Sequence, residues 1–243
     1  MSTLRKYAAN LQLDQGVLEE VMRVMKLKSK NKTKREKICI LFFDEIHLSA
    51  EIEIDKKTEQ KVGPAKTAQV GMVRGLTSSW KQPVYYKYDQ NLTKQIVENV
   101  IKRLYDAGYT VVSITTDMGT SNVAVWNDFN VGFDHGNKSY FIHPEDPSLK
   151  VFVFADPPHL LKLFRNHFFD SGFYVDSKHL EKGVLEELLT FSDKKDYKLN
   201  HNLKQEHLDV KYSKRQRVSP SCKVFFEQYF RCSQLSCYDG CNG

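Results

Sequence analysis

Runs of apolar residues mark the central strands of the predicted fold. Three segments, 37–49, 109–117 and 150–156, contain nearly continuous apolar or β-branched runs, such as ICILFF, TVVSI and VFVFA. A strand with one face in water would alternate, so a continuous run predicts a strand that is covered on both faces. Alternating and aromatic patterns predict an exposed hairpin and two further strands, at 51–63, 68–76 and 81–89.

Between these strands the apolar period changes to that of a helix. Residues 91–108 carry apolar side chains every three or four positions and end in a glycine, which suits a helix terminus. Residues 118–129 predict a helix with Thr120 or Ser121 as its N-cap. Residues 157–169 open with two prolines, which the first turn of a helix tolerates.

The two ends of the chain give weaker patterns. Residues 1–27 have helical spacing with a break at Gly16, which predicts two short helices. Such a pair forms either a helix-turn-helix or a cap on the following domain. Toward the C-terminus short helices are predicted at 183–191, 203–210 and 222–230, followed by an aperiodic tail.

The order of the elements predicts the fold class. Three strands come first, and then helices alternate with strands, so antiparallel pairing is followed by helix-connected strands. This is the layout of a ribonuclease H-like α/β domain, with a mixed sheet flanked by helices. We expect an N-terminal helical segment before it and a truncated helical extension after it. Ligand sites in such sheets lie at the carboxyl ends of the parallel strands.

Composition narrows the class of protein. The chain has 243 residues, of which 41% are hydrophobic and 27% charged, so a core can form and wholesale disorder is excluded. No run approaches the roughly 18 apolar residues of a membrane span, and no apolar leader opens the chain. We therefore expect an intracellular protein with no membrane partner. Its cysteines are expected to be thiols, and the spacing of the last four is a poor match to a zinc site.

The net charge is mildly basic and locally concentrated. Lys and Arg number 36 against 30 Asp and Glu, which gives a net charge of +6. Residues 26–37, KLKSKNKTKREK, form a basic segment that includes Lys32, Lys34 and Arg35. The segment is a solvated linker, a strip that contacts phosphates, or a nuclear import signal.

Three aspartates follow the buried strands and are the candidate chemical groups. They are Asp44, Asp117 and Asp156. Carboxylates gathered at one sheet edge repel one another unless a cation lies among them, and Mg²⁺ prefers oxygen ligands. Two such ions can activate a water or a 3′-hydroxyl for phosphodiester cleavage. The alternative is that each aspartate only caps a helix or forms a turn.

Several long phrases identify a family resemblance. FFDEIHLS, VRGLTSSWKQPVYY, SITTDMGTSN and FADPPHLLKLFRN resemble, in the same order, the catalytic domain of P-element-type transposases, including their THAP-finger-linked relatives in animals. The resemblance covers most of the chain, from about Leu4 to about Phe230. It implies an RNase H-like fold that cuts and pastes DNA with two divalent metal ions, Mg²⁺ or Mn²⁺.

The resemblance also assigns residues. It implies that Asp44 and Asp117 are catalytic metal ligands, while Asp156 matches a motif that more often caps the following helix. The third acid of the family is a glutamate beyond an inserted GTP-binding domain, and this chain resembles only the start of that insertion. We therefore expect little or no transposition by this chain, and GTP binding is doubtful because no phosphate-binding loop motif is present.

The implied domains and partners follow. The predicted domains are a helix-turn-helix-like segment, a basic linker, the RNase H-like domain and the truncated insertion, at 1–27, 28–37, 38–169 and 170–243. DNA is the expected partner, in the nucleus, and a homo-oligomer is left open. Lys162 and Arg165, three apart on one helix, are candidate contacts to the DNA backbone, as are Lys32, Lys34 and Arg35.

Two rival interpretations remain at this stage. One is a non-catalytic DNA- or protein-binding module that keeps the RNase H-like scaffold. The other is an independent nuclease that uses Asp156 as its third acid.

Overall fold

The computed structural model divides the chain into two compact units, Met1–Asp156 and Pro157–Gly243. The structure describes residues 14–48, 53–54, 61–62, 65–132, 138–193, 203–209, 215, 217–219, 221 and 224. The predictions for residues 1–13, for the last four cysteines and for the C-terminal tail lie outside these residues. Within the described residues, no helix is long and apolar enough to cross a membrane.

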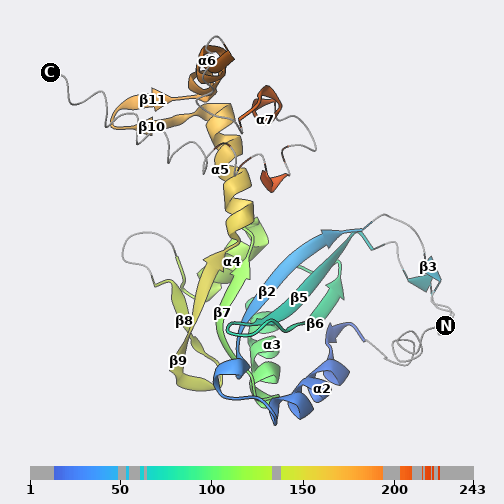
Figure 1. Cartoon of the computed structure of the whole chain (residues 1–243). Coiled ribbons are helices and arrows are strands. Elements are labelled where there is room, and N and C mark those ends of the chain that lie inside the picture. The colour runs from blue at the N-terminus through green and yellow to red at the C-terminus, as the bar shows by residue number, and fades with distance from the viewer. Residues whose placement is uncertain are drawn as a thin grey trace. The chain divides into compact units, whose positions relative to one another are not determined.

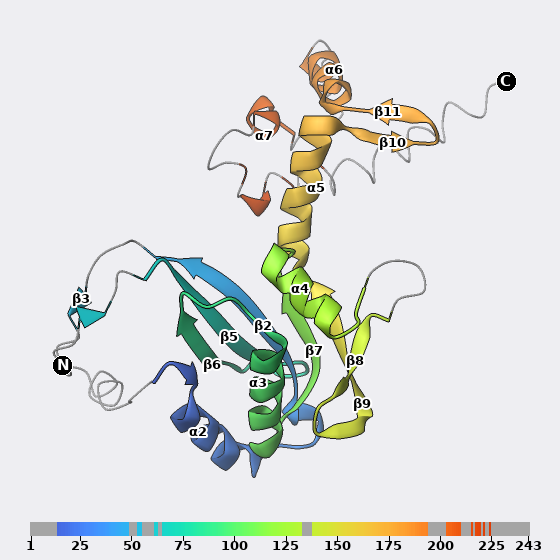
Figure 2. The ribbon, with the colours of Figure 1, turned by 180° about the vertical axis from the view of Figure 1, so that it is seen from behind.

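The first unit is built on a mixed sheet of seven strands in the order β1-β6-β5-β2-β7-β9-β8 (Figures 1 and 2). In chain order the strands are β1 Gly16–Val17, β2 Ile38–His47, β5 Thr67–Gly75, β6 Lys81–Tyr88, β7 Thr110–Thr116, β8 Tyr140–His143 and β9 Asp146–Ala155. β2 pairs antiparallel with β5 and parallel with β7, and β7 pairs parallel with β9. This arrangement confirms the RNase H-like mixed sheet.

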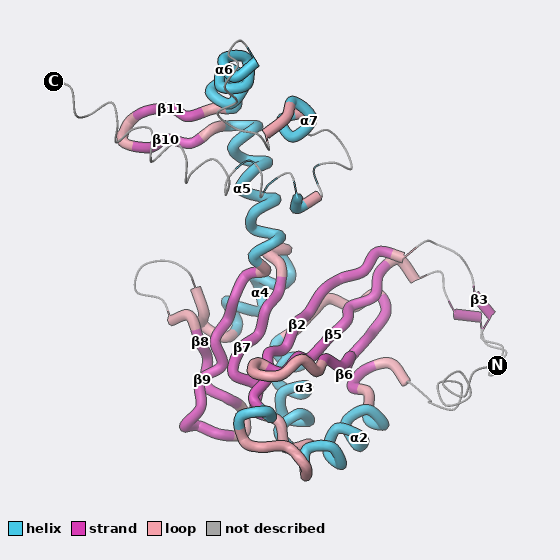
Figure 3. The backbone as a smooth tube through the Cα atoms, in the orientation of Figure 1, coloured by secondary structure: helices cyan, strands magenta, loops and turns pink. Residues whose placement is uncertain are grey.

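Helices connect and cover these strands, as the tube in Figure 3 shows by colour. They are α2 Glu19–Ser29, the 3-10 helix Arg35–Lys37, α3 Lys94–Asp106 and α4 Thr120–Asp128. The predicted hairpin is present at its described residues, where β3 Glu53–Ile54 pairs antiparallel with β4 Lys61–Val62. α3 begins after Thr93, whose hydroxyl accepts a hydrogen bond from the Ile96 amide, and Gly108 follows its end with a positive φ of 86°.

One face of the sheet holds the core. Cys39, Leu41 and Phe43 of β2 are buried in one cluster with residues of α2, α3 and α4. The other face of the same strands was also predicted to be covered. On that face, however, Phe152 and Phe154 of β9 are 41% and 54% exposed. The prediction is therefore wrong for these positions within the first unit, because α2, α3 and α4, the α-helices of its described residues, all contribute to the core on the Leu41 face.

The break predicted at Gly16 is a short strand and the helix predicted after it is α2, whereas the helix predicted before it lies outside the described residues. Gly16 and Val17 form an edge strand that pairs with Tyr86 and Tyr85 of β6, so these two residues are not helical. The basic segment is also more ordered than a linker, because α2 continues to Ser29 and a 3-10 helix follows at Arg35–Lys37. α2 contributes Met22 and Met25 to the core cluster, which favours the cap over a separate helix-turn-helix.

The second unit contains α5 Pro157–Ser171, the hairpin β10 Phe173–Val175 with β11 Lys178–Leu180, α6 Lys182–Asp193 and α7 Gln205–Leu208. Its apolar cluster joins Phe169 of α5 to Leu185 of α6 and to Leu203 and Leu208. α5 therefore groups with the C-terminal part, and the unit boundary lies after Asp156 and not at the predicted residue 169.

Removal of the Leu41 side chain tests the assignment of the core face. Leu41 is fully buried in the central strand, so Leu41→Ala should lower the free energy of unfolding by about 2–5 kcal/mol in a denaturant titration. Leu76→Ala is the matched control, because Leu76 is 52% exposed, and its effect should stay within about 0.5 kcal/mol. Equal losses for the two variants would contradict the assignment.

The buried His143 predicts a pH dependence of stability. Burial lowers the pKa of its imidazole, against the opposing carboxylates of Asp146 and Glu145. The folded chain therefore binds fewer protons at this site than the unfolded chain, whose histidine pKa is about 6.5, and stability is lost as the pH falls below that value. In thermal melts His143→Phe should weaken this dependence, whereas His47→Phe at an exposed strand end should retain it. Identical pH profiles for wild type and His143→Phe would count against this effect.

Candidate metal and catalytic site

Asp44 lies near the exposed end of the central strand. β2 continues past it to His47, so Asp44 is inside the strand and not directly after it, as the sequence suggested. Pairing with Val70 of β5 fixes its position, and the buried Gln69 amide donates a hydrogen bond to its backbone carbonyl at 3.3 Å. Its side chain is exposed and shares the sheet face of Phe42, two residues earlier.

Within the described part of the chain the side-chain carboxylate of Asp117, unlike that of Asp44, accepts hydrogen bonds from neighbouring residues. It follows β7, and its Oδ1 accepts hydrogen bonds from the Gly119 amide at 2.9 Å and from Asn122 Nδ2 at 2.6 Å. Among the residues that the structure describes, no donor contacts Oδ2. A Cβ added to Gly119 would lie 3.0 Å from Asp117 Oδ1, so the absence of a side chain allows this close approach. Both donors thus fix one oxygen and leave the other without a donor among the described residues.

Asn122 supplies an orphaned polar atom beside this carboxylate. Its side chain is 7% exposed, and its Oδ1 is buried without a hydrogen-bond partner among the described residues. A buried acceptor of this kind is normally satisfied by a protein donor or by water. Asn122 Oδ1 is closed to solvent, so the fit to a divalent ion rests on the carboxylate oxygens of Asp44 and Asp117, which are the ligands that Mg²⁺ prefers.

Strand register brings the aspartates to one edge of the sheet. Phe42 pairs with Thr115, and Thr115 pairs with Phe154, so the three strands are in register. Asp44, Asp117 and Asp156 come two residues after these positions, Asp44 within β2 and the other two just beyond the ends of β7 and β9. Because side chains alternate along a strand, Asp44 shares the face of Phe42.

Asp156 differs from the other two. Its amide donates to the Thr116 carbonyl at 2.8 Å, and it directly precedes α5, as expected for a capping residue. Within the described residues no three His, Cys, Asp or Glu side chains are placed to hold one metal ion. The role of Asp156 as the third acid of an independent nuclease stays a prediction. The capping role stays a prediction.

Three of the candidate DNA contacts lie at the other end of β2 from Asp44. Lys34 and Arg35 are exposed and Lys32 is half-buried, and all three lie between α2 and β2, with Arg35 in the 3-10 helix. In the second unit Lys162 is half-buried. These four residues remain predicted contacts.

The prediction for Arg165 is wrong in this structure. Arg165 is fully buried, and its guanidinium donates to the backbone carbonyls of Arg215 and Arg217 and to the side chain of Asn166. A side chain in that position presents no surface to a phosphate. The helical spacing with Lys162 indicated a shared face but carried no information about the segment that covers Arg165.

The predicted N-cap of α4 also needs correction. α4 begins at Thr120 and its N-cap is Gly119, which has no side chain to cap the helix. The Gly119 carbonyl accepts from the amides of Asn122 and Val123, while its own amide contacts Asp117. The turn is therefore organised around the aspartate. Asn122, in the first turn of α4, takes part in the same turn through the hydrogen bond that its Nδ2 donates to Asp117 Oδ1.

Comparison with known proteins agrees with this geometry. Residues 13–130 match the family described as the TNP-like, RNase H N-terminal domain. The Transposable element P transposase of Drosophila melanogaster is 33% identical over 224 residues, covering 92% of this chain and 29% of that protein. The DNA transposase THAP9 of Homo sapiens is 23% identical over 187 residues, covering 69% of this chain and 21% of that protein.

A solved structure extends the match. The chain aligns with the Drosophila P element transposase strand transfer complex with a TM-score of 0.85 and 32% sequence identity, covering 98% of this chain and 52% of that chain. The chain thus spans less than a third of each curated relative and about half of the solved chain. This chain is a homologue of the P element transposase and carries the TNP-like RNase H N-terminal domain of that family.

Proposed function

We propose that this chain supplies two of the metal-binding carboxylates of a DNA transposase active site. The observation that carries the proposal is the parallel register of β2 and β7, which brings Asp44, near the end of β2, to the same edge of the sheet as Asp117, directly after β7. Asp44 and Asp117 Oδ2 would hold Mg²⁺ or Mn²⁺, which bind well to carboxylate oxygens. The metal would supply charge stabilisation and an activated oxygen nucleophile for cleavage and transfer of DNA strands.

The protein residues would position these ligands. Gly119 and Asn122 hold Asp117 Oδ1, so the carboxylate cannot rotate freely, and Oδ2 stays directed away from its donors. The side-chain amide of Gln69 donates a hydrogen bond to the backbone carbonyl of Asp44 and so helps to fix that residue. Both ligands therefore sit on rigid elements, which the alignment of reacting groups requires.

DNA is the proposed substrate, and we place the protein in the nucleus on that basis. The family relation supports DNA, and the exposed Lys34 and Arg35 could neutralise phosphates. A third carboxylate is needed for full activity, so we propose that this chain alone has little or none. GTP is not proposed as a ligand, because the sequence contains no phosphate-binding loop motif.

A non-catalytic DNA- or protein-binding module is the second candidate. The observation behind it is the basic segment before β2, whose Lys34 and Arg35 are exposed. The two candidates differ in whether the aspartate pair binds a metal ion.

Metal binding by the aspartate pair distinguishes them. Mn²⁺ titration followed by electron paramagnetic resonance should show one saturable site in the wild-type chain. Asp44→Asn and Asp117→Asn should each abolish it, because each removes a charged ligand. Asp128→Asn, an exposed aspartate on α4, is the matched control and should bind as the wild type does. Wild-type binding by Asp44→Asn would refute the metal site and leave the binding module.

The role of Asn122 gives a second prediction. Asn122→Ala removes one of the two donors to Asp117 Oδ1, so Mn²⁺ affinity should fall by about 10- to 100-fold, as is typical of residues that orient metal ligands. Asn127→Ala makes the same change at an exposed position of α4 and should leave the affinity unchanged. Equal affinities for the two variants would show that Asn122 does not orient the ligand.

A further inference from the structure

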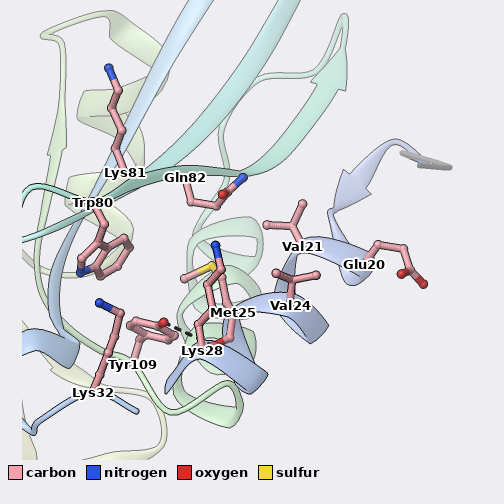
Figure 4. A pocket seen from close by; sticks show the side chains of 10 residues that line it. All are labelled: Glu20, Val21, Val24, Met25, Lys28, Lys32, Trp80, Lys81, Gln82 and Tyr109. Carbon is pink, nitrogen blue, oxygen red and sulfur yellow. Dashed lines mark hydrogen bonds between the residues drawn. The ribbon is translucent and has the colours of Figure 1, made fainter. Parts of the chain in front are cut away.

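A pocket of about 230 Å³ lies between α2 and the start of β6. Val21, Val24 and Met25 line it from α2, and Trp80 and Tyr109 line it from the sheet side (Figure 4). Val24 is 44% exposed although it is apolar, whereas Met25 and Tyr109 are buried. The pocket therefore has an exposed apolar side chain, Val24, at its opening and the buried Met25 and Tyr109 at its base.

The charges around this pocket are mostly positive. Lys28, Lys32 and Lys81 line it, against one acidic residue, Glu20. Figure 4 shows the Lys28 amine in the middle of the lining group and the Lys32 amine beneath the Trp80 ring. Lys32 Nζ lies 5.7 Å from the centroid of that ring. The lining thus complements a ligand that is anionic at one end and apolar at the other.

The aromatic wall is held in place. Trp80 Nε1 donates to the Glu36 carbonyl at 3.1 Å, and the indole meets the Tyr109 ring edge-on at 5.1 Å between centroids. Tyr109 in turn donates its hydroxyl to the Met25 carbonyl at 3.3 Å, the dashed line in Figure 4. A ring fixed in this way loses little conformational freedom when a ligand packs on it.

The pocket is separate from the aspartate site. Lys81 pairs with Arg74, and the adjacent Gly75 pairs with Cys39 at the start of β2. Asp44 lies five residues further along β2, a distance of about 16 Å along the strand. A ligand in this pocket would therefore occupy a second site near the opposite edge of the sheet.

We propose that this pocket binds one unpaired nucleotide of a DNA strand. The base would pack against Trp80 and Val24, with its phosphate between Lys28 and Lys32. Aromatic side chains flanked by lysines are the usual means of binding single-stranded nucleic acid without sequence preference. A base held in a duplex could not enter, so the pocket distinguishes single strands from double strands. The inference rests on DNA as the proposed partner but not on metal binding.

A charge placed inside the pocket tests the proposal. Binding of a short, labelled oligothymidylate to the 243-residue chain is followed by fluorescence anisotropy in EDTA. Val24→Glu should weaken binding at least about tenfold, because a carboxylate would face the phosphate. Leu27→Glu is the matched control: it makes the same charge change on the same helix, at a residue that is 60% exposed and does not line the pocket, and should have a much smaller effect.

The lysines provide an independent measurement. Lys28→Ala with Lys32→Ala should reduce the slope of log affinity against log salt by about 1.4, or 0.7 for each lost phosphate contact on a single strand. Lys26→Ala with Lys30→Ala removes the same charge from residues that do not line the pocket and should change the slope less. The duplex form of the oligonucleotide should bind more weakly than the single strand.

The outcomes separate this inference from the metal site. Equal effects of Val24→Glu and Leu27→Glu, or equal slopes for the two lysine pairs, would overturn the pocket assignment even if Mn²⁺ still binds at Asp44 and Asp117. Displacement of the oligonucleotide by a polyglutamate peptide at equal affinity would also overturn it in favour of an acidic protein partner. Loss of Mn²⁺ binding in Asp44→Asn with unchanged oligonucleotide binding would support two separate sites.

Discussion

The parallel pairing of β7 with β2 on one side and β9 on the other is the constraint on which the candidate site depends. Phe42, Thr115 and Phe154 are in register, so β2, β7 and β9, which are far apart in sequence, lie side by side near the same edge of the sheet. The core on the opposite face, around Leu41, Val111 and Val153, holds that register, because a slip by one residue would turn these side chains out of the core. The register that brings Asp44 and Asp117 to one edge of the sheet is thus held by the core around Leu41.

Much of this arrangement could be predicted from local sequence. The apolar runs at 109–117 and 150–156 indicated β7 and β9, and the helical spacing of 91–108 indicated α3. These elements are specified by neighbours in the sequence, and so is the close contact of Asp117 with Asn122, which lies in the first turn of the next helix. The family resemblance added the catalytic assignment, which periodicity alone could not supply.

The features that could not be predicted depend on partners distant in sequence. Gly16 and Val17 become a strand only because β6 offers a free edge to them. Arg165 looks like a surface cation in its helix, yet its guanidinium satisfies carbonyls about fifty residues later in the chain. The pocket beside Trp80 is lined by residues of α2, by Lys32, and by Trp80 and Tyr109 much later in the chain, and no local motif indicates it.

The central claim is that Asp117 binds a metal ion through the oxygen that Gly119 and Asn122 leave free. The most direct test is a crystal of this chain soaked in Mn²⁺, with the metal located by its anomalous scattering. The account predicts a peak between the Asp44 carboxylate and Asp117 Oδ2, with the Asn122 hydrogen bond to Oδ1 intact. A peak at another site, or no peak between these two aspartates at a saturating Mn²⁺ concentration, would contradict it.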